Sequence, residues 1–176
     1  MLEGIIDFSW TLFLDRDGVI NKRFWGDYVK KVDDFHIESG VFEFLNFANF
    51  SFHKIIVVTN QQGVGKGIMT ESDLEEIHRF MIDSIEKKGG RIDRVYSATN
   101  LKDAQNNIRK PNSFMGLQAK NDYPTIDFNK SIMIGDTNSD ILFGKNLGMK
   151  TILINSLETV TEESDFQINS LTELIF

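Results

Sequence analysis

The sequence contains no cysteine at any of its 176 positions. Disulfide bonds, zinc sites built on thiolates and catalysis by a cysteine nucleophile are therefore excluded. The sequence also lacks any run of Lys or Arg longer than two residues, and its 26 Asp and Glu outnumber 19 Lys and Arg. An acidic chain without a basic stretch is not expected to bind nucleic acid or anionic lipid stably.

Targeting segments and long apolar runs are missing as well. Residues 1–7 lack the basic and apolar regions of a secretory signal, and no stretch approaches the length of a membrane span. We therefore expect a cytoplasmic protein with no membrane partner. The chain has no repeats or low-complexity linkers, which predicts a single domain over residues 1–176.

What the sequence does contain is a regular alternation of apolar segments. Its hydrophobic content of 41%, with 15 Phe, is sufficient for a sizeable core. Strands are expected at 10–14, 54–59, 92–98, 131–134, 151–154 and 166–168, and helices at 41–50, 70–88, 112–120, 138–146 and 171–175. Residues 22–39 are expected to form a loop or hairpin over the strand ends. This order predicts a Rossmann-like α/β fold, a doubly wound, mainly parallel sheet with helices on both faces.

Two aspartates, Asp15 and Asp17, follow directly after the apolar segment 10–14. The carboxyl end of a buried parallel strand is where open α/β sheets place their ligands. Because two like charges this close repel each other, either a cation lies between them or one carries a proton. An Asp-Gly turn after a strand is the alternative explanation, and the segments downstream decide between the two.

Thr59 ends the β-branched segment 54–59 and precedes the glycine-rich stretch 60–67. A hydroxyl and free backbone N–H groups at a strand end can hold phosphate oxygens. The stretch is not a P-loop, which requires Gly in place of Asn60 and Ser or Thr in place of Gly67. Taken alone, it is better explained as a glycine-rich turn.

Lys110 precedes Pro111 at the expected start of the helix 112–120. Proline is favourable at the first helical position, so the pattern places Lys110 at a helix amino terminus. A cation is unfavourable there unless it faces an anion, which the helix N–H groups would bind as well. A solvated basic pair, Arg109 and Lys110, is the simpler alternative.

Asp136 follows the apolar segment 131–134 and Gly135, and Asp140 lies four residues further on. Asp136 by itself could cap the next helix. Two more carboxylates at a strand end instead indicate a hard cation bound by oxygen ligands. Mg²⁺ fits carboxylates, water and a phosphate.

These four segments together resemble the motifs of the haloacid dehalogenase-like (HAD) phosphatase superfamily. They occur in the family's order over residues 10–154, and the matching positions are Asp15, Asp17, Thr59, Lys110, Gly135, Asp136 and Asp140. The resemblance implies a phosphomonoester hydrolase with an aspartyl-phosphate intermediate.

The resemblance also implies roles for these residues. Asp15 is expected to attack phosphorus, and Asp17 to act as acid and then base, with a pKa raised by the charge of Asp15. Thr59 and Lys110 are expected to stabilise the phosphate oxygens.

The same resemblance implies a magnesium site. Asp15, the backbone carbonyl of Asp17 and Asp136 are expected to hold Mg²⁺. Asp140 is expected to act on the metal through water or to orient Lys110.

Finer features resemble the branch that contains D-glycero-D-manno-heptose 1,7-bisphosphate phosphatases and histidinol-phosphate phosphatases. They lie at 15–21, 59–63 and 109–111. The short stretch between strands one and two leaves no room for a large cap domain. The residues beside the motifs that are expected to contact substrate are Asn60, Gln61, Arg109 and Tyr28.

This branch usually carries a zinc loop, and the chain departs from that pattern. Ser97, Thr99, Asn106 and Ile108 stand where the zinc ligands would be. Because these residues are poor zinc ligands, we expect no zinc, and we expect the loop 99–108 to be held by hydrogen bonds and packing. The three histidines, His36, His53 and His78, are scattered and are expected at the surface or in packing, not as ligands.

A small phosphorylated metabolite is thus the expected partner, with removal of the 7-phosphate of heptose 1,7-bisphosphate as the leading hypothesis. Histidinol phosphate is the nearest alternative, followed by a polynucleotide 3′-phosphate, which the acidic charge disfavours. A non-catalytic HAD-like binding module is the remaining alternative. The Phe-rich residues 35–52 fit either the core or the interface of a homo-oligomer.

Overall fold

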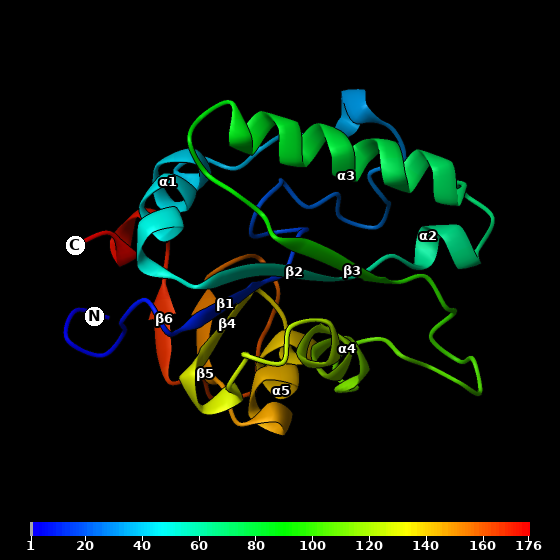
Figure 1. Cartoon of the computed structure of the whole chain (residues 1–176). Helices are drawn as coiled ribbons and strands as arrows, with labels where there is room; N and C mark the ends of the chain where they lie inside the picture. Colours follow the sequence, from blue (N-terminus) through cyan, green and yellow to red (C-terminus); the bar gives the residue numbers. More distant parts are fainter. Residues whose placement is uncertain (1) are drawn as a thin grey trace.

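The computed structural model describes residues 2–176, whose centre is a six-stranded sheet in the order β3-β2-β1-β4-β5-β6 (Figure 1). The strands are β1 (Thr11–Leu14), β2 (Lys54–Asn60), β3 (Arg94–Ala98), β4 (Ser131–Gly135), β5 (Lys150–Ile154) and β6 (Phe166–Ile168). The helices are α1 (Val41–Ser51), α2 (Gln62–Gly65), α3 (Glu71–Glu86), α4 (Phe114–Asp122) and α5 (Asn138–Leu147), with 3₁₀ turns at Val32–Asp34, Phe128–Lys130 and Leu171–Leu174. All five neighbouring strand pairs are parallel, which confirms the predicted fold class.

The central strands are apolar on both sides because helices cover both faces of the sheet. Leu12 and Leu14 pack into one core cluster with residues of α1 and α3, whereas Phe13 packs into a second cluster with residues of α4 and α5. Figure 1 shows these two helix pairs on opposite sides of the strands. The alternation of side chains along a strand therefore divides the core into two layers.

The sheet changes its direction of growth at β1. The chain runs from β1 outward to β2 and β3, then returns to add β4 on the other side of β1. Leu14 is in register with Ile134, and the amide of Asp15 donates to the carbonyl of Ile134 at 2.9 Å. The first residue after β1 thus lies beside the end of β4, at the switch point where such sheets bind ligands.

The segment between β1 and β2 forms a loop closed by antiparallel pairing at its base. Lys22 donates to the carbonyl of His36, and Glu38 donates to that of Ile20, at 2.8 and 2.9 Å. The expected loop or hairpin is therefore confirmed. Among residues 2–176 this segment contains only α1 and one 3₁₀ turn, so no large cap domain is present there.

The expected start of the helix 112–120 is wrong. Helix α4 begins at Phe114, so Pro111 is not its first residue and Lys110 does not lie at its amino terminus. The reason is a turn that comes first: Asn112 donates from its backbone to Arg109, and its side chain accepts from the amide of Phe114. Within residues 2–176, no helix is both long and apolar enough to span a bilayer.

Candidate functional site

Lys110 is the buried centre of the site. Its side chain is 1% exposed, and its Nζ lies 2.7 Å from Asp15 Oδ1, 2.6 Å from Asp140 Oδ1 and 2.6 Å from the carbonyl oxygen of Val58. Burial lowers the pKa of Lys110, but the two carboxylates outweigh this and hold the pKa above its usual value. Lys110 is therefore a fixed cation that links the ends of β1 and β2 to α5.

Asn60 holds the backbone of Lys110 in place. Its side-chain oxygen accepts from the Lys110 amide at 2.9 Å, and its Nδ2 donates to the Lys110 carbonyl at 3.2 Å. Asn60 lines the cavity, as expected for a substrate contact, but the oxygen and the nitrogen of its side-chain amide both bond to the backbone of Lys110. Asn60 ends β2 and thus supports Lys110, which lies 50 positions further along the chain.

The Asp17 carboxylate is bound by three side chains. Arg16 Nη2 lies 3.0 Å from both of its oxygens, Asn21 Nδ2 donates to Oδ1 at 2.9 Å, and Gln61 Nε2 donates to Oδ2 at 2.6 Å. Burial raises the pKa of Asp17, but the charge of Arg16 and these hydrogen bonds hold it below its usual value. The expectation that Asp15 raises the pKa of Asp17 is therefore wrong, because local donors prevail over the like charge.

Gln61 connects Asp17 to the end of β2. Its Nε2 also donates to Thr59 Oγ1 at 2.9 Å, and both residues are 1% exposed. Gln61, which was expected to contact substrate, therefore donates to two other predicted site residues, Asp17 and Thr59. Thr59, Asn60 and Gln61 all line the same cavity.

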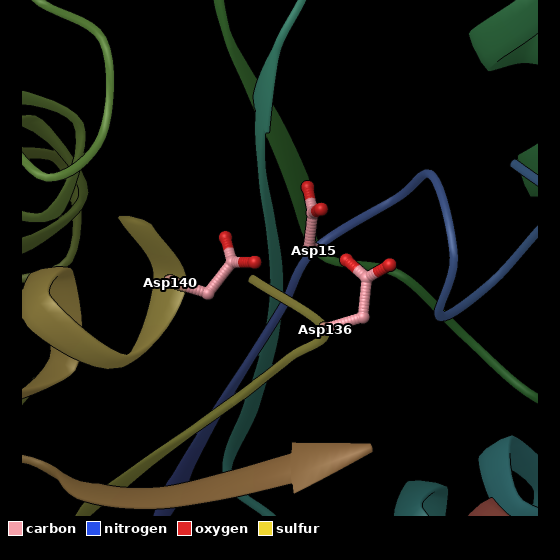
Figure 2. Close-up of side chains that lie close together, drawn as sticks. All are labelled: Asp15, Asp136 and Asp140. Atoms are coloured by element: carbon pink, nitrogen blue, oxygen red, sulfur yellow. The ribbon is translucent and has the colours of Figure 1, made fainter. Parts of the chain in front are cut away.

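Asp15, Asp136 and Asp140 form a cluster of three buried carboxylates (Figure 2). One oxygen of each lies within 4.8 Å of the others. Burial, together with the neighbouring charges of Asp140 and Asp17, raises the pKa of Asp15 to about 6. Burial and the charge of Asp15 raise the pKa of Asp136 to about 8.

The cluster fits a hard divalent cation. Asp136 is fully buried, yet its Oδ2 has no hydrogen-bond partner. A buried carboxylate oxygen without a partner is costly, and carboxylate and carbonyl oxygens are the ligands that Mg²⁺ prefers. Asp140 is less free, because its Oδ2 accepts from the backbone and hydroxyl of Thr137 at the start of α5 while its Oδ1 pairs with Lys110.

Two glycines allow these carboxylates to approach the strand ends. Gly18 has φ of +92°, and a Cβ there would collide with the Asp136 carboxylate. A Cβ at Gly135 would overlap the side chain of Asp140 in the same way. Both positions therefore exclude larger residues for reasons of space, and at Gly18 also for reasons of backbone conformation.

Arg23 also reaches the cluster, although no pattern in the sequence singled it out. Its Nη2 lies 2.6 Å from Asp136 Oδ1, 3.1 Å from the carbonyl oxygen of Asp17 and 3.9 Å from Asp15 Oδ2. Burial lowers the pKa of Arg23, but Asp136 and Asp15 outweigh this and raise it. In the sequence, Arg23 is one of two adjacent basic residues shortly after Asp17, and nothing there distinguishes it from Lys22.

The site opens into a cavity of about 530 Å³ at the carboxyl ends of the strands. Arg109 and Tyr28, both expected to contact substrate, line it together with Lys66. Arg109 Nη1 is buried without a partner, and burial lowers the pKa of Arg109 because no carboxylate offsets it. The Lys66 side chain lies over the Tyr28 ring, with Nζ 5.4 Å from the ring centroid.

The histidines lie outside the cluster. His78 packs on the fully buried Arg16, with Nε2 3.2 Å from Nη1, and burial lowers the pKa of His78 to about 3. His53 contacts the hydroxyl of Thr125. Among the described residues, the three-carboxylate cluster consists of aspartates alone.

The loop 99–108 is held by side-chain hydrogen bonds, as expected. Asn107 donates to the carbonyl of Lys102 and accepts from the amide of Arg109, while Asn112 donates to the carbonyl of Asn107, at 2.8 to 3.0 Å. These bonds connect the loop directly to Arg109 and so to Lys110.

Comparison with known proteins places this geometry in a family. A family model described as HAD-hydrolase-like matches residues 107–174. The D-glycero-alpha-D-manno-heptose-1,7-bisphosphate 7-phosphatase of Campylobacter jejuni is 34% identical over 94% of this chain and 93% of its own length. The D-glycero-beta-D-manno-heptose-1,7-bisphosphate 7-phosphatase of Helicobacter pylori is also 34% identical, over 97% of this chain and 98% of its own length.

A solved structure shows the same fold. The D,D-heptose 1,7-bisphosphate phosphatase of B. bronchiseptica, complexed with magnesium and phosphate, superposes with a TM-score of 0.83. It is 21% identical and covers 94% of this chain and 96% of that one.

Proposed function

The chain belongs to the HAD-like hydrolases, and from this membership and its site we propose that it is a magnesium-dependent phosphatase acting through Asp15. The leading substrate is D-glycero-D-manno-heptose 1,7-bisphosphate, from which it removes the 7-phosphate. The observation that carries the proposal is the ion-paired contact of Asp15 with Lys110 inside the carboxylate cluster. A nucleophile and a phosphate-binding cation thus face one cavity.

In the first step, an oxygen of Asp15 forms a bond to phosphorus while the bond from phosphorus to the sugar oxygen breaks. Lys110 and Thr59 would donate to the phosphoryl oxygens as charge builds up on them. Lys110 already lies 2.7 Å from Asp15, which fixes the direction of the attacking carboxylate. The product of this step is an aspartyl-phosphate on Asp15.

Asp17 gives its proton to the departing sugar oxygen in this step. In the second step it takes a proton from water, whose oxygen attacks phosphorus and releases inorganic phosphate and free Asp15. The pKa of Asp17 is held low by Arg16 and Gln61. A phosphate dianion arriving beside it would raise that pKa, so substrate binding favours the protonated form.

Asp15, the carbonyl of Asp17 and Asp136 would hold Mg²⁺, with Asp140 directing Lys110. When bound, the metal supplies positive charge that offsets the repulsion between the Asp15 carboxylate and the phosphate. The unpartnered oxygen of Asp136 supports this assignment.

The cations at the cavity support a substrate with two phosphates. Lys110 lies at the catalytic end, whereas Arg109 and Lys66 line the same cavity without a carboxylate partner within 4.0 Å among the described residues. A second phosphate would fill the role of that missing anion for Arg109. We therefore propose Arg109 as a substrate contact, with Tyr28 beside it.

The test is release of inorganic phosphate with and without Mg²⁺ over a defined set of substrates. The set contains both anomers of heptose 1,7-bisphosphate, histidinol phosphate and a 3′-phosphorylated oligonucleotide. We expect magnesium-dependent release, fastest with a heptose bisphosphate, and the 1-phosphate to remain on the product.

Preference for histidinol phosphate or for the oligonucleotide would overturn the substrate assignment while keeping the chemistry. No turnover of any substrate by folded protein with Mg²⁺ would favour a binding module instead.

A further inference from the structure

Arg23 lies at the point where the proposed magnesium ligands meet. Its Nη2 approaches the carboxylate of Asp136, the carbonyl of Asp17 and the carboxylate of Asp15 at 2.6, 3.1 and 3.9 Å. Arg23 is only 24% exposed in its side chain. One nitrogen of this guanidinium therefore contacts the same three groups that would bind the metal.

A guanidinium and a divalent cation cannot share this position. Both would need the same oxygens at contact distance, and two cations in a buried site repel each other. Binding of Mg²⁺ therefore requires the guanidinium of Arg23 to move.

Two further groups lie near the guanidinium of Arg23. Arg23 Nη1 lies 3.9 Å from Glu158 Oε2, and the guanidinium lies over the Trp25 ring, 5.7 Å from its centroid. Both Glu158 and Trp25 line the 530 Å³ cavity. The second guanidinium nitrogen thus already has a carboxylate near it, and the guanidinium already contacts an aromatic ring.

Arg23 and Trp25 also separate two cavities. Both residues line the catalytic cavity and a second one of about 550 Å³, and Asp136 lines only the second. Movement of Arg23 toward Glu158 would therefore open Asp136 to the catalytic cavity.

We propose that Arg23 is a tethered counter-ion that competes with Mg²⁺ for Asp15, Asp17 and Asp136, and that metal binding transfers it to Glu158. This inference rests on the proposed function, since it concerns the same metal site. It predicts that Arg23 weakens metal binding and stabilises the metal-free protein.

Titration calorimetry of the full chain with Mg²⁺ tests the competition. Arg23→Met keeps the length and packing of the side chain but removes the cation, so its Kd for Mg²⁺ is expected to fall by roughly tenfold or more. Lys66→Met is the matched control, because it removes one charge from the same cavity without touching the three oxygens. Its Kd is expected to change less than about threefold.

Thermal unfolding supplies the second readout. In EDTA, Arg23→Met is expected to melt below the parent protein, because buried carboxylates lose their cation. Saturating Mg²⁺ is expected to remove that difference, which a purely structural defect would not allow.

If the Kd of Arg23→Met for Mg²⁺ is equal to or higher than that of the parent protein, the inference is overturned and the proposed phosphatase function is unaffected. Absence of magnesium binding in both proteins would overturn the inference and the proposed metal requirement together. If Arg23→Met binds Mg²⁺ more tightly as expected, but the parent protein releases no phosphate from any substrate, the result counts against the proposed function alone.

Discussion

At the scale of single residues, the site depends on how Lys110 is held. The side chain makes three polar contacts, while Asn60 bonds to both the amide and the carbonyl of its peptide. The side-chain amide of Asn60 therefore fixes the loop that carries Lys110 to the end of β2. This arrangement gives Asn60 a positioning role that its place beside Thr59 in the sequence does not show.

Asn60→Ala is expected to lower kcat by roughly 10- to 100-fold with little change in KM, because Lys110 would no longer be held against Asp15. Steady-state phosphate release measures both constants. Asn46→Ala, which removes an exposed side-chain bond to the carbonyl of Lys88, is the matched control and should leave both unchanged. A rise in KM with constant kcat would instead support the direct substrate contact that the sequence suggested.

The sequence was sufficient to select the residues that meet at the strand ends, but not their electrostatics. Asp15, Asp17, Thr59, Lys110 and Asp136 all reach one cavity or the cluster beside it. The pKa of Asp17 could not be predicted, since it depends on donors whose directions only the folded chain defines.

Arg16 and Arg23 show the same limit. Both lie in or near the first motif, yet one is buried against His78 and the other reaches the carboxylate of Asp136, 113 residues away. No spacing rule in the sequence connects such partners.

At the scale of elements, helices with strong local signals were predicted well. Helix α3 starts within one residue of the expected bound at 70, where Thr70 and Asp73 form both reciprocal bonds of a capping box. The short α2 was missed because four residues cannot show a helical repeat. The start of α4 was misplaced because the turn at Asn112 depends on contacts with Asn107, which a proline rule does not contain.

Thr70→Ala is expected to lower the free energy of unfolding by about 1 kcal/mol, because the Asp73 amide at the start of α3 loses its acceptor. Chemical denaturation measures this change. Activity should be retained, since Thr70 lies outside the cavity.

Thr161→Ala, at an exposed threonine outside any helix, is the matched control and should shift stability by less than about 0.5 kcal/mol. Equal effects of the two substitutions would contradict the capping account.

At the scale of the whole molecule, the buried carboxylates couple stability to pH. The pKa of Asp136 is raised from 3.8 to about 8 by burial and by Asp15. Between these values the folded protein holds a proton that the unfolded chain has released, so stability falls as pH rises toward 8. Asp17 and His78 do not change protonation between pH 7 and 8, because their shifted pKa values lie well below this window.

In EDTA, the melting temperature is therefore expected to fall between about pH 7 and pH 8, and Mg²⁺ should flatten this slope. Asp136→Asn cannot release the proton and should lose the slope in EDTA. A slope that persists in the variant would assign it to another group.

The central claim is that Asp15 attacks phosphorus, and its most direct test is phosphate release by Asp15→Asn. The assay compares this variant with the parent protein on heptose 1,7-bisphosphate with Mg²⁺, after circular dichroism has shown that both are folded. We expect turnover to fall by at least about 10³-fold, because an amide cannot form the aspartyl-phosphate. Turnover by the folded variant within about tenfold of the parent protein would contradict the account.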